Sequence, residues 1–255
     1  MPNVLAIVAH PDDIEFVMAG TLLQLALRGW TVHYMNVANG SCGSMTSDVA
    51  TITAIRLKES RSAAALIPAI FHPPVCDDMG IFYDAKTLAM VASIVRQSNP
   101  TIVLTHSPQD YMEDHETTCR LAVSGTFVKS MPNFETDPPI APIKNGPVAI
   151  YHAQPHGNQT PLRQPVFPTT LVNISSVLDR KVAMLKCHAS QEGWLDETQK
   201  ISSYVESMKA AAFEMGQQSQ RFEAAEGFRR HLHLGFSEST FHPLKDALGQ
   251  DTIDV

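Results

Sequence analysis

Two acidic residues and a histidine stand within four positions near the amino terminus, in His10-Pro11-Asp12-Asp13. Holding two carboxylates together costs free energy, because like charges repel and partly buried carboxylates lose hydration. A metal cation removes that cost. His10 and Asp13 are three residues apart on one turn, so both can reach one ion, whereas Asp12 points elsewhere and is left free to handle protons. A helix cap would explain a single Asp but not the whole cluster.

A second group of ligand-type residues lies much later in the chain, in His106-Ser107-Pro108-Gln109-Asp110-Tyr111-Met112-Glu113-Asp114-His115. A lone histidine at a helix start is usually a surface or capping residue. Here His115 follows three acidic residues, which favours a metal ligand. The sequence therefore predicts that this stretch and the His10 stretch meet at one site.

The elements around both stretches indicate how they meet. The uncharged apolar run 4–8 predicts a strand buried on both faces, and a helix follows over 16–28. Strand and helix then alternate, with strands at 31–37, 69–75 and 101–105 and helices at 51–67, 85–97 and 116–128. This alternation is typical of an α/β, Rossmann-like doubly wound, mostly parallel sheet with helices on both faces, a three-layer α/β/α architecture. Ligands bind at the carboxyl ends of such strands.

The second half of the chain differs in composition, because prolines are concentrated in one part of it. Nine of the 17 prolines lie in 132–168, which excludes long helices there and predicts loops around a strand at 148–152, folded over the site. His152 and His156 of this region either approach the substrate or are ordinary loop histidines. We further expect a strand at 169–174, a helix to about 188, a helix at 195–215 and a short helix at 217–228. The tail beyond 236 shows no strong pattern, and one domain is expected over 1–255.

Composition excludes several classes of protein. The net charge of −7 is spread along the chain without a basic block, which argues against a nucleic-acid binder. The four cysteines form no CxxC pair, as expected for reduced thiols in a cytoplasmic protein. No apolar segment is long enough to span a membrane, and the amino terminus lacks the basic residues of a signal peptide. The absence of GxGxxG after the first strand argues against a nucleotide-dependent Rossmann enzyme.

Several short motifs, taken together, point to one family. They are Ala9-His10-Pro11-Asp12-Asp13 with Glu15, Asn39-Gly40, Arg56-x-x-Glu59, Asp110-Tyr111-x-x-Asp114-His115, His188-Ala189-Ser190-Gln191 and Ala225-Glu226-Gly227-Phe228. In this combination the sequence resembles the PIG-L / LmbE-like de-N-acetylase family over most of residues 3 to 230. The resemblance implies a Zn²⁺-dependent hydrolase of linear amides that removes acetyl from an N-acetylated amino sugar of the N-acetylglucosamine type. It also implies a single deacetylase domain that assembles into trimers or hexamers.

The resemblance assigns roles to individual residues. It implies His10, Asp13 and His115 as zinc ligands, which leaves a coordination position open, and Asp12 as the base that activates water on the zinc. The same donors would also suit Fe²⁺ or Co²⁺. Arg56, Asn39, Asp110 and Tyr111 are expected to bind the small amino-sugar substrate. Asp114, next to His115, is expected to orient a neighbouring side chain.

One departure from the family pattern concerns catalysis. The family's usual His-Pro-Asp-His motif reads Met112-Glu113-Asp114-His115 here, and a thioether cannot donate the hydrogen bond that the first histidine supplies to the oxyanion. Zinc must then do more, or Tyr111, Arg56, His152 or His188 is the donor. Two alternatives stay open: an amidase acting on another N-acyl group or a thiol-sugar conjugate, and a non-catalytic metal-containing sugar-binding protein. Met112 favours the binding protein, and Asp12 argues against it.

Overall fold

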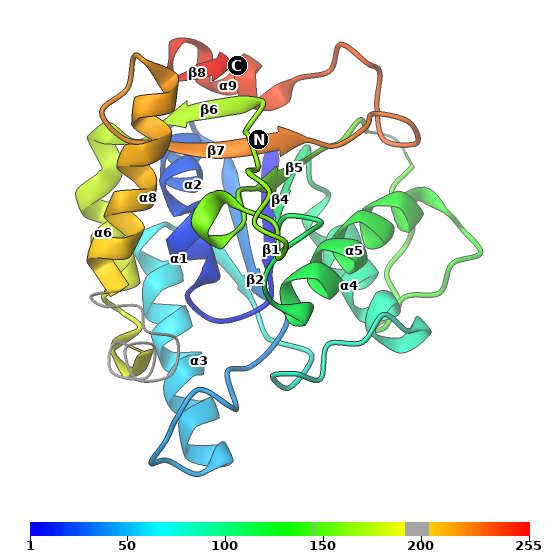
Figure 1. The fold of residues 1–255 in the computed structure, drawn as a ribbon. Helices are drawn as coiled ribbons and strands as arrows, with labels where there is room; N and C mark the ends of the chain where they lie inside the picture. Colours follow the sequence, from blue (N-terminus) through cyan, green and yellow to red (C-terminus); the bar gives the residue numbers. More distant parts are fainter. Residues whose placement is uncertain (145, 192–203) are drawn as a thin grey trace.

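The computed structural model of the chain describes residues 1–144, 146–191 and 204–255. Within these residues one eight-stranded sheet runs through the molecule in the order β3-β2-β1-β4-β5-β7-β6-β8 (Figure 1). Its strands are β1 (Asn3–Val8), β2 (Thr31–Asn36), β3 (Ile70–His72), β4 (Ile102–Thr105), β5 (Ala149–Ala153), β6 (Thr170–Asn173), β7 (Ala225–Arg230) and β8 (Thr252–Asp254).

The first five strands are mutually parallel, and the sheet grows outward from β1 in both directions. β2 and β3 lie on one side of β1, and β4 and β5 lie on the other. Where the winding reverses, between β1 and β4, the loops after the two strands diverge and open a crevice at their carboxyl ends. The predicted doubly wound, mostly parallel α/β fold is thereby confirmed, and the two ligand-rich stretches leave the sheet at this crevice.

Helices cover both faces of the sheet. They are α1 (Asp13–Val17), α2 (Ala19–Leu27), α3 (Val49–Leu66), α4 (Ala85–Ser98), α5 (Glu113–Phe127), α6 (Leu178–Leu185), α8 (Tyr204–Ser219) and α9 (Pro243–Leu248). Because side chains alternate along a strand, Val4, Ala6 and Val8 of β1 join one core and Leu5 and Ile7 join the other. The first core includes residues of α2, α6 and α8, and the second includes residues of α4 and α5, on the opposite side in Figure 1.

The expected single helix over 16–28 is in fact two. α1 begins at Asp13, and the helix breaks at Met18, whose φ is −148°. α2 restarts because Glu226 accepts hydrogen bonds from the backbone N–H groups of Gly20 (2.8 Å) and Thr21 (2.7 Å). A carboxylate at a helix amino terminus also interacts favourably with the helix dipole. A residue more than 200 positions away therefore sets the start of α2.

The expected helix over 217–228 is wrong. Residues Ala225–Arg230 form β7, which pairs antiparallel with β5 and with β6. α8 ends at Ser219, whose hydroxyl accepts hydrogen bonds from the N–H groups of Arg221 and Phe222 and turns the chain. Pairing with β5 and β6 then outweighs the helix propensity of residues 225–228. The start of the helix expected at 195–215 lies outside the described residues, and the tail beyond 236 contains α9 and β8.

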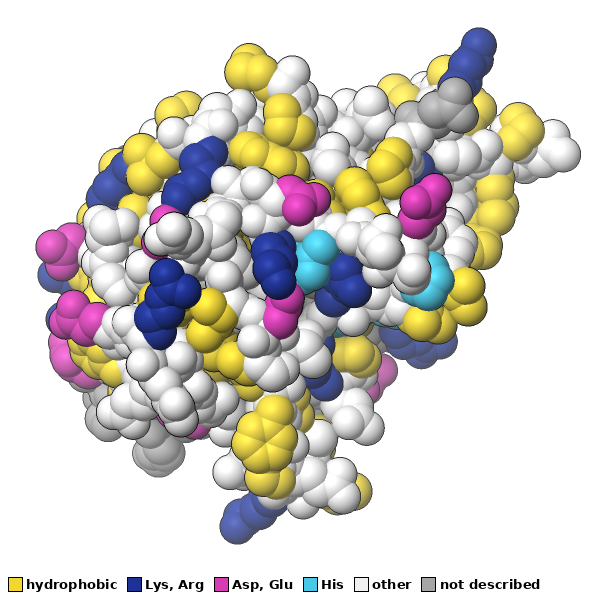
Figure 2. Space-filling model, turned by 90° about the horizontal axis from the view of Figure 1, so that it is seen from above, with side chains coloured by type: hydrophobic (Ala, Val, Ile, Leu, Met, Phe, Trp, Pro, Cys, Tyr) yellow, Lys and Arg dark blue, Asp and Glu magenta, His cyan; other side chains and the backbone are white. Residues whose placement is uncertain are grey.

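Surface features agree with the composition. No helix in the described ranges has the length and apolar character needed to cross a bilayer. Figure 2 shows a face on which dark-blue Lys and Arg side chains alternate with magenta Asp and Glu instead of forming one positive stripe. In the carboxyl-terminal segment Lys245 pairs with Asp254. Asp251 of the same segment pairs with Arg28, which follows α2.

Candidate functional site

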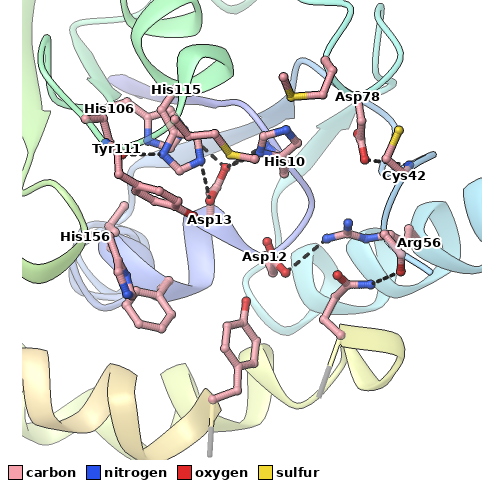
Figure 3. Close-up of a pocket in the computed structure, with 18 of the residues that line it drawn as sticks. His10, Asp12, Asp13, Cys42, Arg56, Asp78, His106, Tyr111, His115 and His156 are labelled. Carbon is pink, nitrogen blue, oxygen red and sulfur yellow. Dashed lines mark hydrogen bonds and ion pairs between the residues drawn. The ribbon is translucent and has the colours of Figure 1, made fainter. Parts of the chain in front are cut away.

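The two ligand-rich loops meet at the crevice between β1 and β4, as Figure 3 shows. Nε2 of His115 lies 3.5 Å from one oxygen of Asp13, and Nδ1 of His10 lies 3.5 Å from the other. The two imidazole rings are 5.5 Å apart between centroids. Three of the residues expected to bind a metal are thus brought together from loops a hundred positions apart.

The outward-facing nitrogens of both imidazoles are engaged by other carboxylates. Nε2 of His10 lies 3.0 Å from Asp114, and Nδ1 of His115 lies 3.0 Å from Asp110. A carboxylate only accepts hydrogen bonds, so these two nitrogens carry the protons in the neutral rings. Nδ1 of His10 and Nε2 of His115 are the nitrogens that face Asp13, and in the neutral rings they carry the lone pairs that can bind a metal. Histidines that bind metals are oriented by carboxylates in this way.

The donor set fits a divalent ion. Metal–ligand distances of about 2.0–2.2 Å in a tetrahedral zinc site place neighbouring ligand atoms about 3.4 Å apart, close to the 3.5 Å separations between Asp13 and the two imidazoles. Although burial opposes it, hydrogen bonds to Asp114 and Asp13 raise the pKa of His10 to about 10. The carboxylates therefore favour positive charge here, and an ion would supply it.

His106, the first residue after β4, belongs to this cluster, although the motif comparison did not single it out. Its ring stacks on His115 with centroids 4.0 Å apart, and its Nε2 lies 3.3 Å from Asp13. However, Nε2 accepts a hydrogen bond from the N–H of Ala9 (2.9 Å), which occupies its lone pair. Burial and then the neighbouring His115 lower the pKa of His106, which keeps it neutral. We interpret His106 as a residue that positions the ring of His115 by stacking on it, and not as a metal ligand. Its place at the carboxyl end of a strand was the available signal.

Asp12 lines the same pocket as the three candidate ligands, and its own carboxylate pairs with Arg56. Its backbone has φ = +104°, a region that non-glycine residues rarely adopt and that often marks functional sites. Its carboxylate lies 3.1 Å from Nη2 of Arg56, which also donates to the carbonyl of Pro11. Burial raises the pKa of Asp12, and the charge of Arg56 partly offsets that rise. An ionisable carboxyl with a raised pKa beside a metal site is suited to proton transfer.

Arg56 and Asn39, both expected to bind substrate, are placed differently in the structure. Arg56, 4% exposed, lines the pocket but is committed to the Asp12 turn. The side chain of Asn39 turns away to Asp77 and to the N–H of Ser41. What the Asn39-Gly40 turn provides is space, because a Cβ at Gly40 would collide with Cδ of Arg56 and one at Gly43 would lie 2.6 Å from its Nη1.

The two residues expected to bind substrate on the second loop also differ. Asp110 also lines the pocket, but it is buried and its carboxylate is bonded to the imidazole of His115. Tyr111 is half-exposed, lines the pocket and places its ring edge-on to His115. Asp114, expected to orient a neighbouring side chain, contacts His10 and the N–H of Met79.

Residues from the second half of the chain pack around the site or line its pocket. His188 bonds to the fully buried Glu15 (3.1 Å), and Ser190 bonds to Glu59 of α3. In the proline-rich region His156 lines the pocket, whereas His152 faces the backbone carbonyl of His106 and the ring of His231. Tyr204, the first residue of α8, also lines the pocket, where its hydroxyl approaches Asp12 closely enough to oppose the rise that burial causes in the pKa of that carboxyl. No sequence motif had marked it.

Comparison with known proteins agrees with this geometry. The family description PIG-L, "GlcNAc-PI de-N-acetylase", matches residues 5–125, a span that contains both ligand-bearing loops. The amino-terminal part of the chain thus matches the PIG-L/LmbE-like family. It is 27% identical over 198 residues to diacetylchitobiose deacetylase of Thermococcus kodakarensis, covering 74% of this chain and 70% of that protein. It is also 26% identical over 198 residues to 4-oxalmesaconate hydratase of Pseudomonas putida, covering 74% of each.

Solved structures of PIG-L/LmbE-like proteins share the fold. The 4-carboxy-2-hydroxymuconate hydratase of Pseudomonas putida superimposes with a TM-score of 0.77 at 24% identity, covering 95% of this chain and 99% of that one. N,N'-diacetylchitobiose deacetylase of Pyrococcus horikoshii gives 0.74 at 23% identity, covering 95% and 88%. Proteins that share this fold thus include a deacetylase and a hydratase.

Proposed function

We propose that this protein is a zinc-dependent hydrolase that removes the acetyl group from the nitrogen of an N-acetylglucosamine-type amino sugar. The observation that carries the proposal is the arrangement around Asp13. One ring nitrogen each of His10 and His115 faces its carboxylate, while Asp12 lines the same pocket and pairs with Arg56. Three protein ligands and an adjacent unbound acid are what metal-assisted hydrolysis requires.

The residues present would share the chemistry as follows. A Zn²⁺ ion held by His10, Asp13 and His115 would polarise the acetamide carbonyl and lower the pKa of a water molecule. Asp12 takes the proton from that water as its oxygen attacks the carbonyl carbon, and it later gives the proton to the leaving amine. Arg56 holds the Asp12 turn in its strained conformation through Pro11 and the carboxylate. Tyr111, His156 and Phe16 line the part of the pocket where the sugar ring would lie.

The experiment is acetate release by the full chain loaded with one equivalent of Zn²⁺. N-acetylglucosamine and N,N'-diacetylchitobiose are the first substrates, with free amine measured in parallel. We expect release to stop when a chelator removes the metal and to return when Zn²⁺ is restored. An N-acyl panel with longer acyl groups and a thiol-sugar conjugate separates acetyl removal from other amide hydrolysis. Absence of acetate from every substrate would refute the proposal.

A second candidate is addition of water to a carbon–carbon double bond of an unsaturated oxo-tricarboxylate. Its support is the 26% identity to the Pseudomonas putida hydratase, which extends over the same share of the chain as the deacetylase match. The same metal and base would activate water for this reaction. The loss of ultraviolet absorbance from 4-oxalmesaconate would reveal it, and a protein with this activity and no acetate release would be a hydratase.

A further inference from the structure

The site needs a hydrogen-bond donor for the oxygen that becomes negative when water adds to a carbonyl. Met112 lines the pocket but has no donor. His188 is directed at Glu15, and His152 at the carbonyl of His106. Arg56 is engaged by Pro11 and Asp12. Of the donors that the sequence suggested, Arg56, His152 and His188 are therefore committed elsewhere, and Tyr111 remains in the pocket.

Tyr204 offers a donor from an unexpected element. It is the first residue of α8, it lines the same pocket as Asp12, and only 7% of it is exposed. Its hydroxyl approaches Asp12 closely enough to lower the pKa of that carboxyl, although burial has the larger and opposite effect. Its ring stacks on Phe16 with centroids 5.7 Å apart, and Phe16 lies on the helix that follows directly from Asp12 and Asp13. Ring packing thus holds Tyr204 against the wall of the pocket that Asp12 also lines.

The protonation state of Tyr204 suits a donor. Burial, followed by the negative charges of Asp12 and Asp13, raises the pKa of its hydroxyl well above the usual value near 10. At neutral pH the phenol therefore keeps its proton. While Asp12 is ionised, that proton is directed at the carboxylate, which is the strongest nearby acceptor.

We propose that Tyr204 is a catalytic residue whose hydroxyl donates to Asp12 before the reaction and to the tetrahedral oxyanion after Asp12 has accepted a proton. When the water oxygen bonds to the carbonyl carbon, the water proton goes to Asp12 and the carbonyl π pair goes to oxygen. Negative charge thereby leaves the acceptor of Tyr204 and appears on the substrate. The O–H bond of Tyr204 does not break. When the oxyanion collapses, the C–N bond breaks, Asp12 gives its proton to nitrogen, and the hydroxyl returns to Asp12.

This assignment rests on the proposed hydrolysis, and the test separates the two. Tyr204→Phe removes the hydroxyl and keeps the ring on Phe16. The matched control is Tyr83→Phe, because Tyr83 is exposed and its hydroxyl bonds only to Ser124 among the described contacts. The zinc-loaded variants are compared with the wild type in kcat and KM for N-acetylglucosamine. Binding of glucosamine and of its N-methylphosphonamidate, whose P–O oxygens imitate the tetrahedral oxyanion, is measured by calorimetry.

We expect Tyr204→Phe to lower kcat about 100-fold with KM changed less than threefold, the usual loss for one oxyanion donor. Phosphonamidate affinity should fall by a similar factor, with glucosamine affinity unchanged. Equal kcat and phosphonamidate affinity in the variant, or equal weakening of both ligands, would overturn the assignment. If the wild type releases no acetate but its phosphonamidate affinity depends on Tyr204, the hydrolysis proposal fails and the donor assignment stands. If it neither reacts nor binds, both fail.

Discussion

The carboxylate of Asp114 lies 3.0 Å from Nε2 of His10, although the two residues are 104 positions apart. The contact joins the loop after β1 to the first turn of α5 and leaves Nδ1 of His10 as the nitrogen directed at Asp13. Asp114 also accepts a hydrogen bond from the N–H of Met79, which fixes its own orientation. This one carboxylate therefore sets how the first loop presents its imidazole.

We predict that Asp114→Ala weakens Zn²⁺ binding about 10- to 100-fold, because the imidazole of His10 loses its orientation and part of its basicity. Competition with a chelating dye measures the dissociation constant. Glu206→Ala is the control, since Glu206 is exposed and pairs only with Lys209 among the described ion pairs. An unchanged zinc affinity in Asp114→Ala would mean that His10 does not hold the ion.

Asp12→Asn should abolish most turnover without removing the metal. An amide cannot accept the water proton, so kcat should fall by about 10²- to 10⁴-fold. Zinc content should stay at one equivalent, because the carboxylate of Asp12 pairs with Arg56 and is not among the candidate ligands. Elemental analysis and acetate release on the same preparation check both points. Near-normal deacetylation by zinc-loaded Asp12→Asn would show that the base is another group.

Gly40→Ala should disturb Arg56, whereas Gly29→Ala should not. Both glycines have positive φ, +78° and +81°, so alanine is strained at each by about 1–2 kcal/mol. Only at Gly40 would the new Cβ collide with Arg56; at Gly29 no atom lies within 4 Å. Urea unfolding should show a loss in both variants and a larger one in Gly40→Ala, and kcat should fall in Gly40→Ala alone. Equal kcat in the two variants would show that displacing Arg56 does not disturb the Asp12 turn.

Glu226→Ala should destabilise the fold strongly. Glu226 accepts hydrogen bonds from the N–H groups of Gly20 and Thr21. It also forms an ion pair with the buried Lys181, whose Nζ lies 2.6 Å from the carboxylate. Its removal leaves a buried cation without a partner, which typically costs about 3–5 kcal/mol in the free energy of unfolding. The exposed Glu206→Ala should stay within about 0.5 kcal/mol of the wild type in the same urea titration. A comparably small change in Glu226→Ala would show that Lys181 finds another acceptor.

Stability should decline below neutral pH through the pair His33–His72. Their facing nitrogens are 2.9 Å apart, burial lowers the pKa of both, and the pKa of His72 falls to about 4. The unfolded chain binds protons near pH 6.5 and the folded chain does not, so the free energy of unfolding decreases as pH falls from about 6.5 towards 4. Between pH 7.5 and 5 we expect this pair to contribute about 1–2 kcal/mol. In His72→Asn the pH-dependent loss should shrink by that amount; an unchanged loss would assign it to other groups.

The parallel half of the fold and the convergence on Asp13 follow from local signals. Uncharged apolar runs such as Val4–Val8 specify buried strands, and topology alone carries the loops after them to one edge. The roles of Asp110 and Asn39 did not follow, because sequence position gives no side-chain direction: Asp110 turns to His115 and Asn39 to Asp77. Tyr204 was missed for a similar reason, since its function depends on where α8 is packed.

β7 shows what kind of information single-sequence patterns lack. Its residues read as helical in isolation, and their extended form depends on hydrogen bonds to β5 and β6 on both sides. The break between α1 and α2 has the same origin, because Glu226 of β7 fixes the start of α2. Contacts between distant segments decided both places, and local propensity could not report them.

The position of β7 between β5 and β6 bears on how the protein is made in the cell. A ribosome delivers β5 and β6 well before residues 225–230, so the nascent chain holds both strands for a time with unpaired edges. Glu226 arrives equally late, and until then the amino terminus of α2 and the amine of Lys181 have no counter-charge from it. The loop that carries His10 is therefore synthesised long before the carboxylate that fixes the start of α2.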